Sequence, residues 1–184
     1  TTRFISLVYK ENDKNYGLGY TLNKGVNLCT NEIIFRMDTD DIMMNHRIRV
    51  QLDFMNKNPN TAICGAQILL FRDNIKNIVG NTSHPTHTLL SFKKKHIHWL
   101  MNHPTFCFRK SKIIAVGNYN KKTRNMIDDY ELELKLLKKY EILHNIQQPL
   151  LFYRLHPDQL THNGGVGGPV KWHEIRNKLI QDII

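Results

Sequence analysis

The stretch from residue 33 to residue 42, IIFRMDTDDI, decides the fold and points to a site. Its first half, Ile33 to Met37, has the apolar composition of a buried strand. Three carboxylates follow within four positions, on Asp38, Asp40 and Asp41. Because ligands of open α/β sheets bind beyond the carboxyl ends of strands, these side chains are expected to line a ligand site.

Carboxylates this close together repel one another and raise each other's pKa unless a cation neutralises them. Mg²⁺ or Mn²⁺, held by one or two carboxylates plus substrate phosphates, suits that role. The alternative is a surface turn with incidental aspartates, since Asp is common in turns. A calcium loop of the EF-hand type is excluded, because its glycine and its distal glutamate are absent. The buried strand in front of the cluster favours the metal site.

Apolar periodicity on both sides of this stretch predicts alternating strands and helices. The expected strands cover residues 4–8, 33–37, 61–64, 66–71, 105–108 and 150–154, and the expected helices cover 20–29, 45–56, 128–139 and a segment after 169. This alternation favours an α/β fold with a mostly parallel sheet flanked by helices. Residues 1–160 are predicted to form the main domain, and residues 161–184 a glycine-rich loop and an amphipathic C-terminal helix.

The composition suits one globular domain, with 184 residues of which 41% are hydrophobic and 23% charged. The net charge of +10 favours an anionic partner, such as a phosphorylated small molecule or an acidic membrane surface. No nucleic-acid partner is expected, because the basic residues are scattered and no aromatic ladder interleaves them. Three widely spaced cysteines indicate reduced thiols and a cytoplasmic location. The bias towards Lys, Asn and Ile is typical of an AT-rich genome, such as that of a parasite or virus.

Further motifs surround the aspartate cluster in a fixed order. Arg47 and Gln51 lie on the helix that follows it, and the remaining motifs lie at 17–25, 103–119, 127–132 and 153–156. Together they resemble the family-two glycosyltransferases, whose GT-A fold is a Rossmann-like nucleotide-diphospho-sugar transferase domain. The resemblance extends from residue 5 to about residue 160. A lone Asp-x-Asp is weak evidence, whereas the ordered set is specific.

The resemblance implies a metal-dependent inverting glycosyltransferase that moves a sugar from a nucleotide-sugar donor to a hydroxyl acceptor on a glycan, a lipid or a protein. It places Asp38 at the donor ribose or the metal, and Asp40 at the metal, Mn²⁺ or Mg²⁺. Asp41 is a candidate partner for Arg47. His156 matches a position at which some members add an imidazole ligand to the metal, and a solvated loop histidine is the alternative.

By the same resemblance, Asp129 matches the catalytic base, which takes the proton from the acceptor hydroxyl. The alternative is that Asp129 and its neighbour Asp128 only cap and charge the start of a helix. Asn23 and Lys24 in the glycine-containing motif, Asp128, and His103 in the acceptor-side motif are the substrate-binding candidates.

The chain departs from the family pattern at two points. Leu22 stands where many members have an arginine that contacts the diphosphate, so either Lys24 replaces that contact or the contact is lost. The opening Pro-x-Tyr-Asn strand and the acidic residue that reads the nucleotide base are also absent. The chain is therefore expected to start about two βα units late, on the order of 60 residues at roughly 30 per unit.

Two other functions stay open. A non-catalytic truncated homologue that binds a polyanion or a protein would explain the missing start, but not the intact Asp38, Asp40 and Asp129. A nucleotidyltransferase also uses metal-bearing carboxylates, but it would not explain the paired acids at 128–129.

The C-terminal helix carries three basic residues beside an aromatic one and could contact a membrane from its polar face. Packing of this helix on the domain is the preferred interpretation. The residues concerned are Lys171, Trp172, Arg176 and Lys178.

Overall fold

The computed structural model describes residues 6–87, 99–122, 127–159 and 168–183, with the side chains of the last helix described from Glu174 onward. Within these residues six strands form one sheet in the order β1-β5-β3-β6-β2, and β4 pairs with β3 beside this row. The strands are β1 (Ile33–Phe35), β2 (Ile42–Met43), β3 (Ile63–Arg72), β4 (Ile78–Asn81), β5 (Cys107–Arg109) and β6 (His144–Leu155). The helices are α1 (Leu18–Leu28), α2 (Arg47–Lys57), α4 (Lys110–Ala115), α5 (Asp128–Tyr140) and α6 (Gly168–Ile183), with a 3-10 turn η1 (His103–Thr105).

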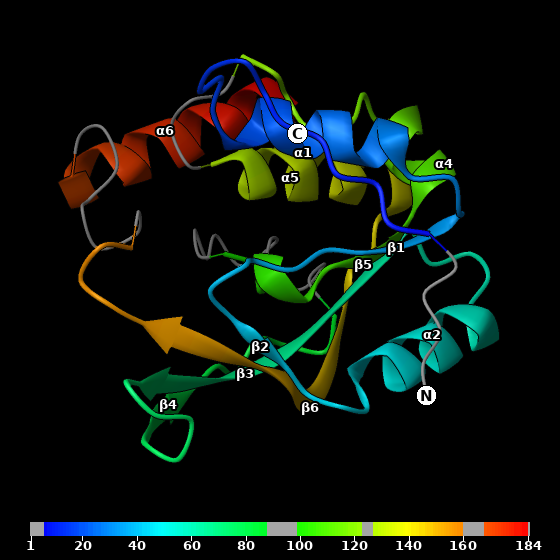
Figure 1. Ribbon diagram of the computed structural model, residues 1–184. Coiled ribbons are helices and arrows are strands. Elements are labelled where there is room, and N and C mark those ends of the chain that lie inside the picture. Colours follow the sequence, from blue (N-terminus) through cyan, green and yellow to red (C-terminus); the bar gives the residue numbers. More distant parts are fainter. Residues whose placement is uncertain (1–5, 88–98, 123–126, 160–167, 184) are drawn as a thin grey trace.

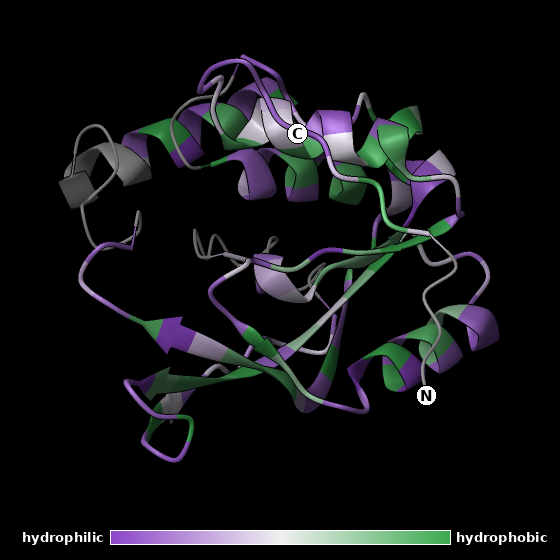
Figure 2. Ribbon diagram, in the orientation of Figure 1, coloured by the Kyte–Doolittle hydropathy of each residue, from purple (hydrophilic) through white to green (hydrophobic). Residues whose placement is uncertain are grey.

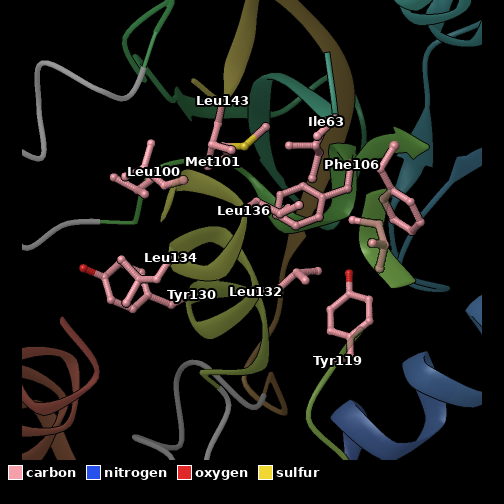
Figure 3. Close-up of a cluster of buried hydrophobic side chains, with 14 of the residues drawn as sticks. Ile63, Leu100, Met101, Phe106, Tyr119, Tyr130, Leu132, Leu134, Leu136 and Leu143 are labelled. Atoms are coloured by element: carbon pink, nitrogen blue, oxygen red, sulfur yellow. The ribbon is translucent and has the colours of Figure 1, made fainter. Parts of the chain in front are cut away.

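Helices lie on both sides of the sheet, with α1, α5 and α6 on one side and α2 on the other (Figure 1). Hydrophobic residues run along the strands, while the helices have mixed faces (Figure 2). The main core lies between the sheet and α5, where Ile63, Phe106 and Leu136 are fully buried (Figure 3). Leu179 and Ile183 of α6 pack against this core, as preferred for the C-terminal helix. No described helix combines the length and apolarity needed to cross a bilayer.

The α/β class is confirmed, but the sheet is not mostly parallel. Among the described strands only β3 and β6 run parallel. The pairs β1–β5, β3–β5, β3–β4 and β2–β6 are all antiparallel. Alternation of strands and helices along a chain does not determine which strands become neighbours. Here β5 lies between β1 and β3, antiparallel to both, and β4 returns along β3 as a hairpin.

Two local expectations also need correction. The expected strands at 61–64 and 66–71 form one continuous strand from Ile63 onward, because Gly65 lies inside β3. A Cβ atom at Gly65 would lie 2.9 Å from both Asn145 Oδ1 and Met101 Cε, so this glycine permits close packing instead of a turn. Residues 6–8 of the expected first strand have no regular structure. The predicted glycine-rich loop lies almost entirely outside the described residues.

Candidate active site

Strand pairing brings the aspartate cluster to the end of β6. Ile42 of β2 pairs with Phe152 of β6, so the segment before β2 lies beside the segment after β6. Asp40 Oδ2 lies 3.1 Å from His156 Nε2, although the two residues are 116 positions apart in sequence. Their side chains are 42% and 33% exposed, respectively, which leaves both open to a ligand.

Asp38 already has a cationic partner in the protein. Its two carboxylate oxygens accept hydrogen bonds from Nη1 and Nη2 of Arg36 at 2.6 and 2.5 Å. The Arg36 side chain is 7% exposed and that of Asp38 is 35% exposed. A bidentate guanidinium fixes the orientation of a carboxylate as well as neutralising it. Asp38 is therefore held with a defined orientation and a partly open surface.

Asp41 is the most buried of the three aspartates, with 7% of its surface exposed. Its Oδ1 accepts a hydrogen bond from the backbone N–H of Arg154 at 3.0 Å, and its Oδ2 has no partner within the described residues. Burial, with smaller contributions from the other two aspartates, raises the pKa of Asp41 to about 7. The expected pairing with Arg47 is wrong. The buried Arg47 donates to Gln51 Oε1 at 2.8 Å and to the carbonyl of Arg36 at 2.7 Å.

The protein offers few ligands for a cation at this edge. Among the described residues no group of three or more His, Cys, Asp or Glu side chains is arranged to hold a metal ion. Asp40 and His156 contribute one carboxylate and one imidazole. Hard cations are often held by one or two carboxylates together with substrate phosphates and water, and an imidazole favours a transition-metal ion such as Mn²⁺ over Mg²⁺. The pair thus fits a cation that a substrate helps to hold.

Asp129 lies in the first turn of α5 and is half-buried. Its Oδ1 accepts the backbone N–H of Tyr130 at 2.8 Å, and its Oδ2 accepts the indole N–H of Trp99 at 3.1 Å. Burial raises the pKa of Asp129 to about 6, although these two donors and the charge of Arg36 oppose the rise. A carboxylate with a pKa near neutrality, fixed on a rigid helix, is suited to accept a proton.

Two further carboxylates of α5 are more deeply buried. Asp128 is 2% exposed, with Oδ1 unpartnered among the described residues, and it packs against Gly19 of α1. Burial and the neighbouring Asp129 raise the pKa of Asp128 to about 7. Glu133 is fully buried, and its Oε2 accepts the backbone N–H of Leu100 at 3.2 Å. The N-cap residue Ile127 makes no side-chain cap bond, so Asp128 and Asp129 lie inside the first turn of α5, where they add negative charge to the helix start.

Asn23 and His103 both contact Tyr119. Asn23 Nδ2 donates to the Tyr119 carbonyl at 2.7 Å, which ties α1 to the segment after α4. His103 Nε2 lies 3.0 Å from the Tyr119 hydroxyl, and its ring packs edge-on against Phe106. Burial lowers the pKa of His103 well below its usual range, so the ring is neutral. Asn23 is only 6% exposed, whereas His103 is partly accessible.

Lys24 lies apart from these residues. It lines a groove of about 640 Å³ between the segment 6–12, α1 and β1. Its Nζ donates to the carbonyl of Glu11 and to Asn12 Oδ1, both at 2.9 Å. The ammonium group is therefore bound within its own part of the chain.

The charge of Arg36 affects groups in both parts of the site, and this residue was not among the sequence candidates. Besides pairing with Asp38, its charge opposes the raised pKa of Asp129 and contributes to the lowered pKa of His103. The buried Nε of Arg36 has no partner within the described residues. The available signal was an arginine inside an otherwise apolar strand.

Comparison with known families identifies relatives of this chain. The family described as "Glycosyl transferase family 2" matches residues 3–117. An E. coli protein named UDP-Gal:alpha-D-GlcNAc-diphosphoundecaprenol beta-1,3-galactosyltransferase is 32% identical over 170 residues, which cover 89% of this chain and 58% of that protein. An uncharacterized glycosyltransferase of Haemophilus influenzae is 32% identical over 155 residues, 83% of this chain and 56% of its own length.

The fold is shared with a solved structure from Staphylococcus aureus. TarS 1–349 in complex with UDP-GlcNAc superposes with a TM-score of 0.64 at 13% identity, over 89% of this chain and 46% of that one. At this identity the likeness concerns the fold alone. The chain spans little more than half the length of the relatives that it matches.

Proposed function

The chain belongs to glycosyl transferase family 2, and from this premise we propose that it transfers a sugar from a nucleotide-sugar to a hydroxyl acceptor, with a divalent cation and with inversion at the anomeric carbon. The observation that carries the proposal is the Asp129 carboxylate. It is fixed by two N–H donors, and burial raises its pKa to about 6, although the charge of Arg36 opposes the rise.

On the donor side, Asp40 and His156 would hold the cation, Mn²⁺ or Mg²⁺. When bound, the cation would neutralise charge on the departing nucleoside diphosphate. Both oxygens of Asp38 already accept from Arg36, which supports a contact of Asp38 with the donor over direct ligation of the metal. The remaining lone pairs of this carboxylate can accept hydrogen bonds from ribose hydroxyls.

On the acceptor side, Asp129 takes the proton of the attacking hydroxyl. An inverting transfer is a single displacement, so it needs one base on the face opposite the leaving group and no protein nucleophile. The neutral ring of His103, partly accessible beside Tyr119, is proposed to contact the acceptor. Asn23 and Asp128 are proposed to act from the interior, by holding the segment and the helix that surround the acceptor.

The acceptor and the location are proposed from the printed name of one relative and from the net charge. The printed name of the E. coli relative contains a diphosphoundecaprenol-linked sugar as acceptor. We propose a lipid-linked hydroxyl acceptor at the cytoplasmic face of a membrane, for which the net charge of +10 suits an anionic surface. The three free cysteines are consistent with a reducing compartment.

A thermal-shift screen of nucleoside diphosphates, each with and without Mn²⁺, tests the donor side first. A ligand that binds only the folded state raises the apparent stability by mass action. We expect a shift with at least one nucleoside diphosphate, larger when Mn²⁺ is present. The proposal fails if no nucleotide shifts the transition while a polyanion such as heparin does, because that pattern belongs to a non-catalytic binding module.

A further inference from the structure

Trp99 connects the last helix to the Asp129 carboxylate. Its indole N–H donates to Asp129 Oδ2 at 3.1 Å. The guanidinium carbon of Arg176, from α6, lies 4.6 Å from the centre of the indole ring. The Arg176 side chain is buried, with 5% of its surface exposed. α6 runs alongside α5 (Figure 1), so the indole is held between the helix that carries Asp129 and the helix that carries Arg176.

The backbone next to Trp99 is fixed to the same helix as Asp129. Glu133 lies one turn after Asp129, and its Oε2 accepts the N–H of Leu100 at 3.2 Å. Leu100 and Met101 are both buried in the main core. The segment is therefore attached to α5 twice, through the Trp99 side chain at Asp129 and through the Leu100 backbone at Glu133.

We propose that Trp99 and Arg176 are positioning residues for Asp129: the guanidinium clamps the indole, and the indole N–H fixes the rotation of the carboxylate. This inference rests on the role proposed for Asp129. With Tyr130 N–H on one oxygen and Trp99 N–H on the other, each oxygen keeps lone pairs for an acceptor hydroxyl. A cation over the face of an indole is attracted by the ring and draws electron density from it, which strengthens the N–H donor.

Other charged and titratable groups also face Asp129. On α5 these are the buried Asp128 and Glu133, and from the end of β1 the guanidinium of Arg36. The Tyr119 hydroxyl belongs to the same surroundings, because Asp129 raises the pKa of that phenol. A hydrogen bond to the ionised carboxylate lowers its pKa, so loss of the Trp99 donor or of its clamp is expected to raise the pKa of Asp129.

The chain itself offers a probe that needs no substrate. Its two tryptophans are Trp99 and Trp172, so Trp172→Phe leaves Trp99 as the single indole fluorophore. Protonation of a carboxylate hydrogen-bonded to the indole changes its emission. We expect a transition near pH 6 in this background, absent in Asp129→Asn and retained in Asp128→Asn.

Substitutions in α6 test the clamp. Arg176→Met should move the transition to higher pH and lower the fluorescence anisotropy of Trp99. Arg176→Lys keeps the charge without the planar stack and should lie between parent and Arg176→Met. Lys178→Met removes an exposed cation from the same helix and should match the parent. The positioning role of Arg176 is wrong if Arg176→Lys and Arg176→Met, both folded by circular dichroism, show the Trp99 fluorescence transition at the same pH as Lys178→Met.

Turnover separates this inference from the function on which it rests. With nucleotide-sugar, Mn²⁺ and acceptor, Trp99→Phe should lower kcat by roughly tenfold to a hundredfold through misplacement of the base. It should also move the acid limb of the pH profile upward, which a loss of packing alone would not do. If Asp129→Asn turns over like the parent, the proposed base is wrong. If Asp129→Asn is inactive while Trp99→Phe keeps both the rate and the acid limb, only the positioning role is wrong.

Discussion

The carboxylates at the edge of the sheet and those at the start of α5 have opposite surroundings. At the sheet edge, Asp38 pairs with a guanidinium and Asp40 with an imidazole, and both are partly exposed. At the helix, Asp129 accepts neutral N–H donors from Trp99 and Tyr130, and burial raises its pKa to about 6. The first arrangement suits stable negative charge beside cations. The second suits a group that changes its protonation during a reaction.

Each region also contains a buried carboxylate next to the exposed ones, with one oxygen unpartnered among the described residues. Asp41 Oδ2 at the sheet edge and Asp128 Oδ1 on α5 lack partners within the described residues, and burial raises the pKa of each residue to about 7. The contrast between the regions therefore lies in Asp38, Asp40 and Asp129, the residues open to a ligand. Substitutions at these positions should separate donor binding from proton transfer.

The largest effect is expected for Asp129→Asn. The amide cannot accept a proton, so transfer should fall by roughly 10² to 10⁴. Nucleoside diphosphate affinity should hardly change, because the helix start contributes nothing to the Asp40–His156 pair. The free energy of unfolding should change by no more than about 1 kcal/mol, because loss of one N–H acceptor is offset by removal of a carboxylate whose pKa burial raises. Steady-state rates and calorimetric titration measure the first two quantities, and urea denaturation measures the third.

Asp53→Asn is the matched control, because this aspartate is exposed on α2. It should leave rate, affinity and stability at parent values. If Asp129→Asn lost as much nucleotide affinity as rate, the assignment of donor binding to the sheet edge and of proton transfer to the helix would be wrong.

Asp40→Asn should produce the complementary result. It removes one of the two groups proposed to hold the cation, so the gain in nucleoside diphosphate affinity that Mn²⁺ provides should fall by roughly tenfold or more. Affinity without Mn²⁺ should stay close to that of the parent. Calorimetry with and without Mn²⁺ measures both. An unchanged Mn²⁺-dependent gain would exclude Asp40 as a ligand and leave the cluster as a surface turn.

Asp128→Asn tests the electrostatics of the buried start of α5. The pKa of Asp128 is about 7 in the folded protein and near 4 in an unfolded chain, so between these values the folded state keeps a proton that the unfolded state has released. Its contribution to stability is therefore fully present below pH 4 and is lost as the pH rises to about 7. The asparagine side chain cannot ionise, so the variant does not lose this contribution. The free energy of unfolding of the variant relative to that of the parent should therefore be higher at pH 8 than at pH 5.

Urea denaturation at the two pH values measures this difference. Asp53→Asn again serves as the control, since an exposed carboxylate should add no such pH dependence. The assignment is contradicted if the difference between Asp128→Asn and the parent is the same at pH 5 and at pH 8.

Local sequence patterns predicted what depends on neighbours along the chain. Apolar periodicity, with Ile127, Tyr130 and Leu134 at i, i+3 and i+7, predicted a helix at 128–139 that matches α5 to within a residue, because one face of that helix is buried in the core. The strand at 33–35 and the three aspartates after it were likewise visible in one continuous stretch.

Contacts between distant segments could not be derived from such patterns. The Asp40–His156 pair spans 116 positions and was expected only from the family resemblance. The Trp99 donor was missed because nothing in its own segment indicates which helix it will meet. Strand direction was missed for the same reason, since β5 enters the sheet between two strands that precede it in the chain. The sequence did mark Arg36 as unusual, because it is an ionised side chain in an apolar stretch. Its pairing with Asp38 depends on the turn that follows, which the pattern does not predict.

The smallest effect is expected for Lys24→Met. If Lys24 replaced the arginine that contacts the diphosphate in many family members, its loss would weaken nucleoside diphosphate binding considerably. In the structure its Nζ is instead held by the Glu11 carbonyl and Asn12 Oδ1, inside the groove beside β1. We therefore expect less than about a twofold change in nucleoside diphosphate affinity and less than about 1 kcal/mol in stability, as is usual for partly exposed polar contacts.

Calorimetry with Mn²⁺ measures the affinity, and Lys10→Met, which removes an exposed lysine lining the same groove, gives the background. A drop of tenfold in Lys24→Met but not in Lys10→Met would show that the ammonium leaves its partners for the diphosphate, and would extend the donor region from the sheet edge to α1.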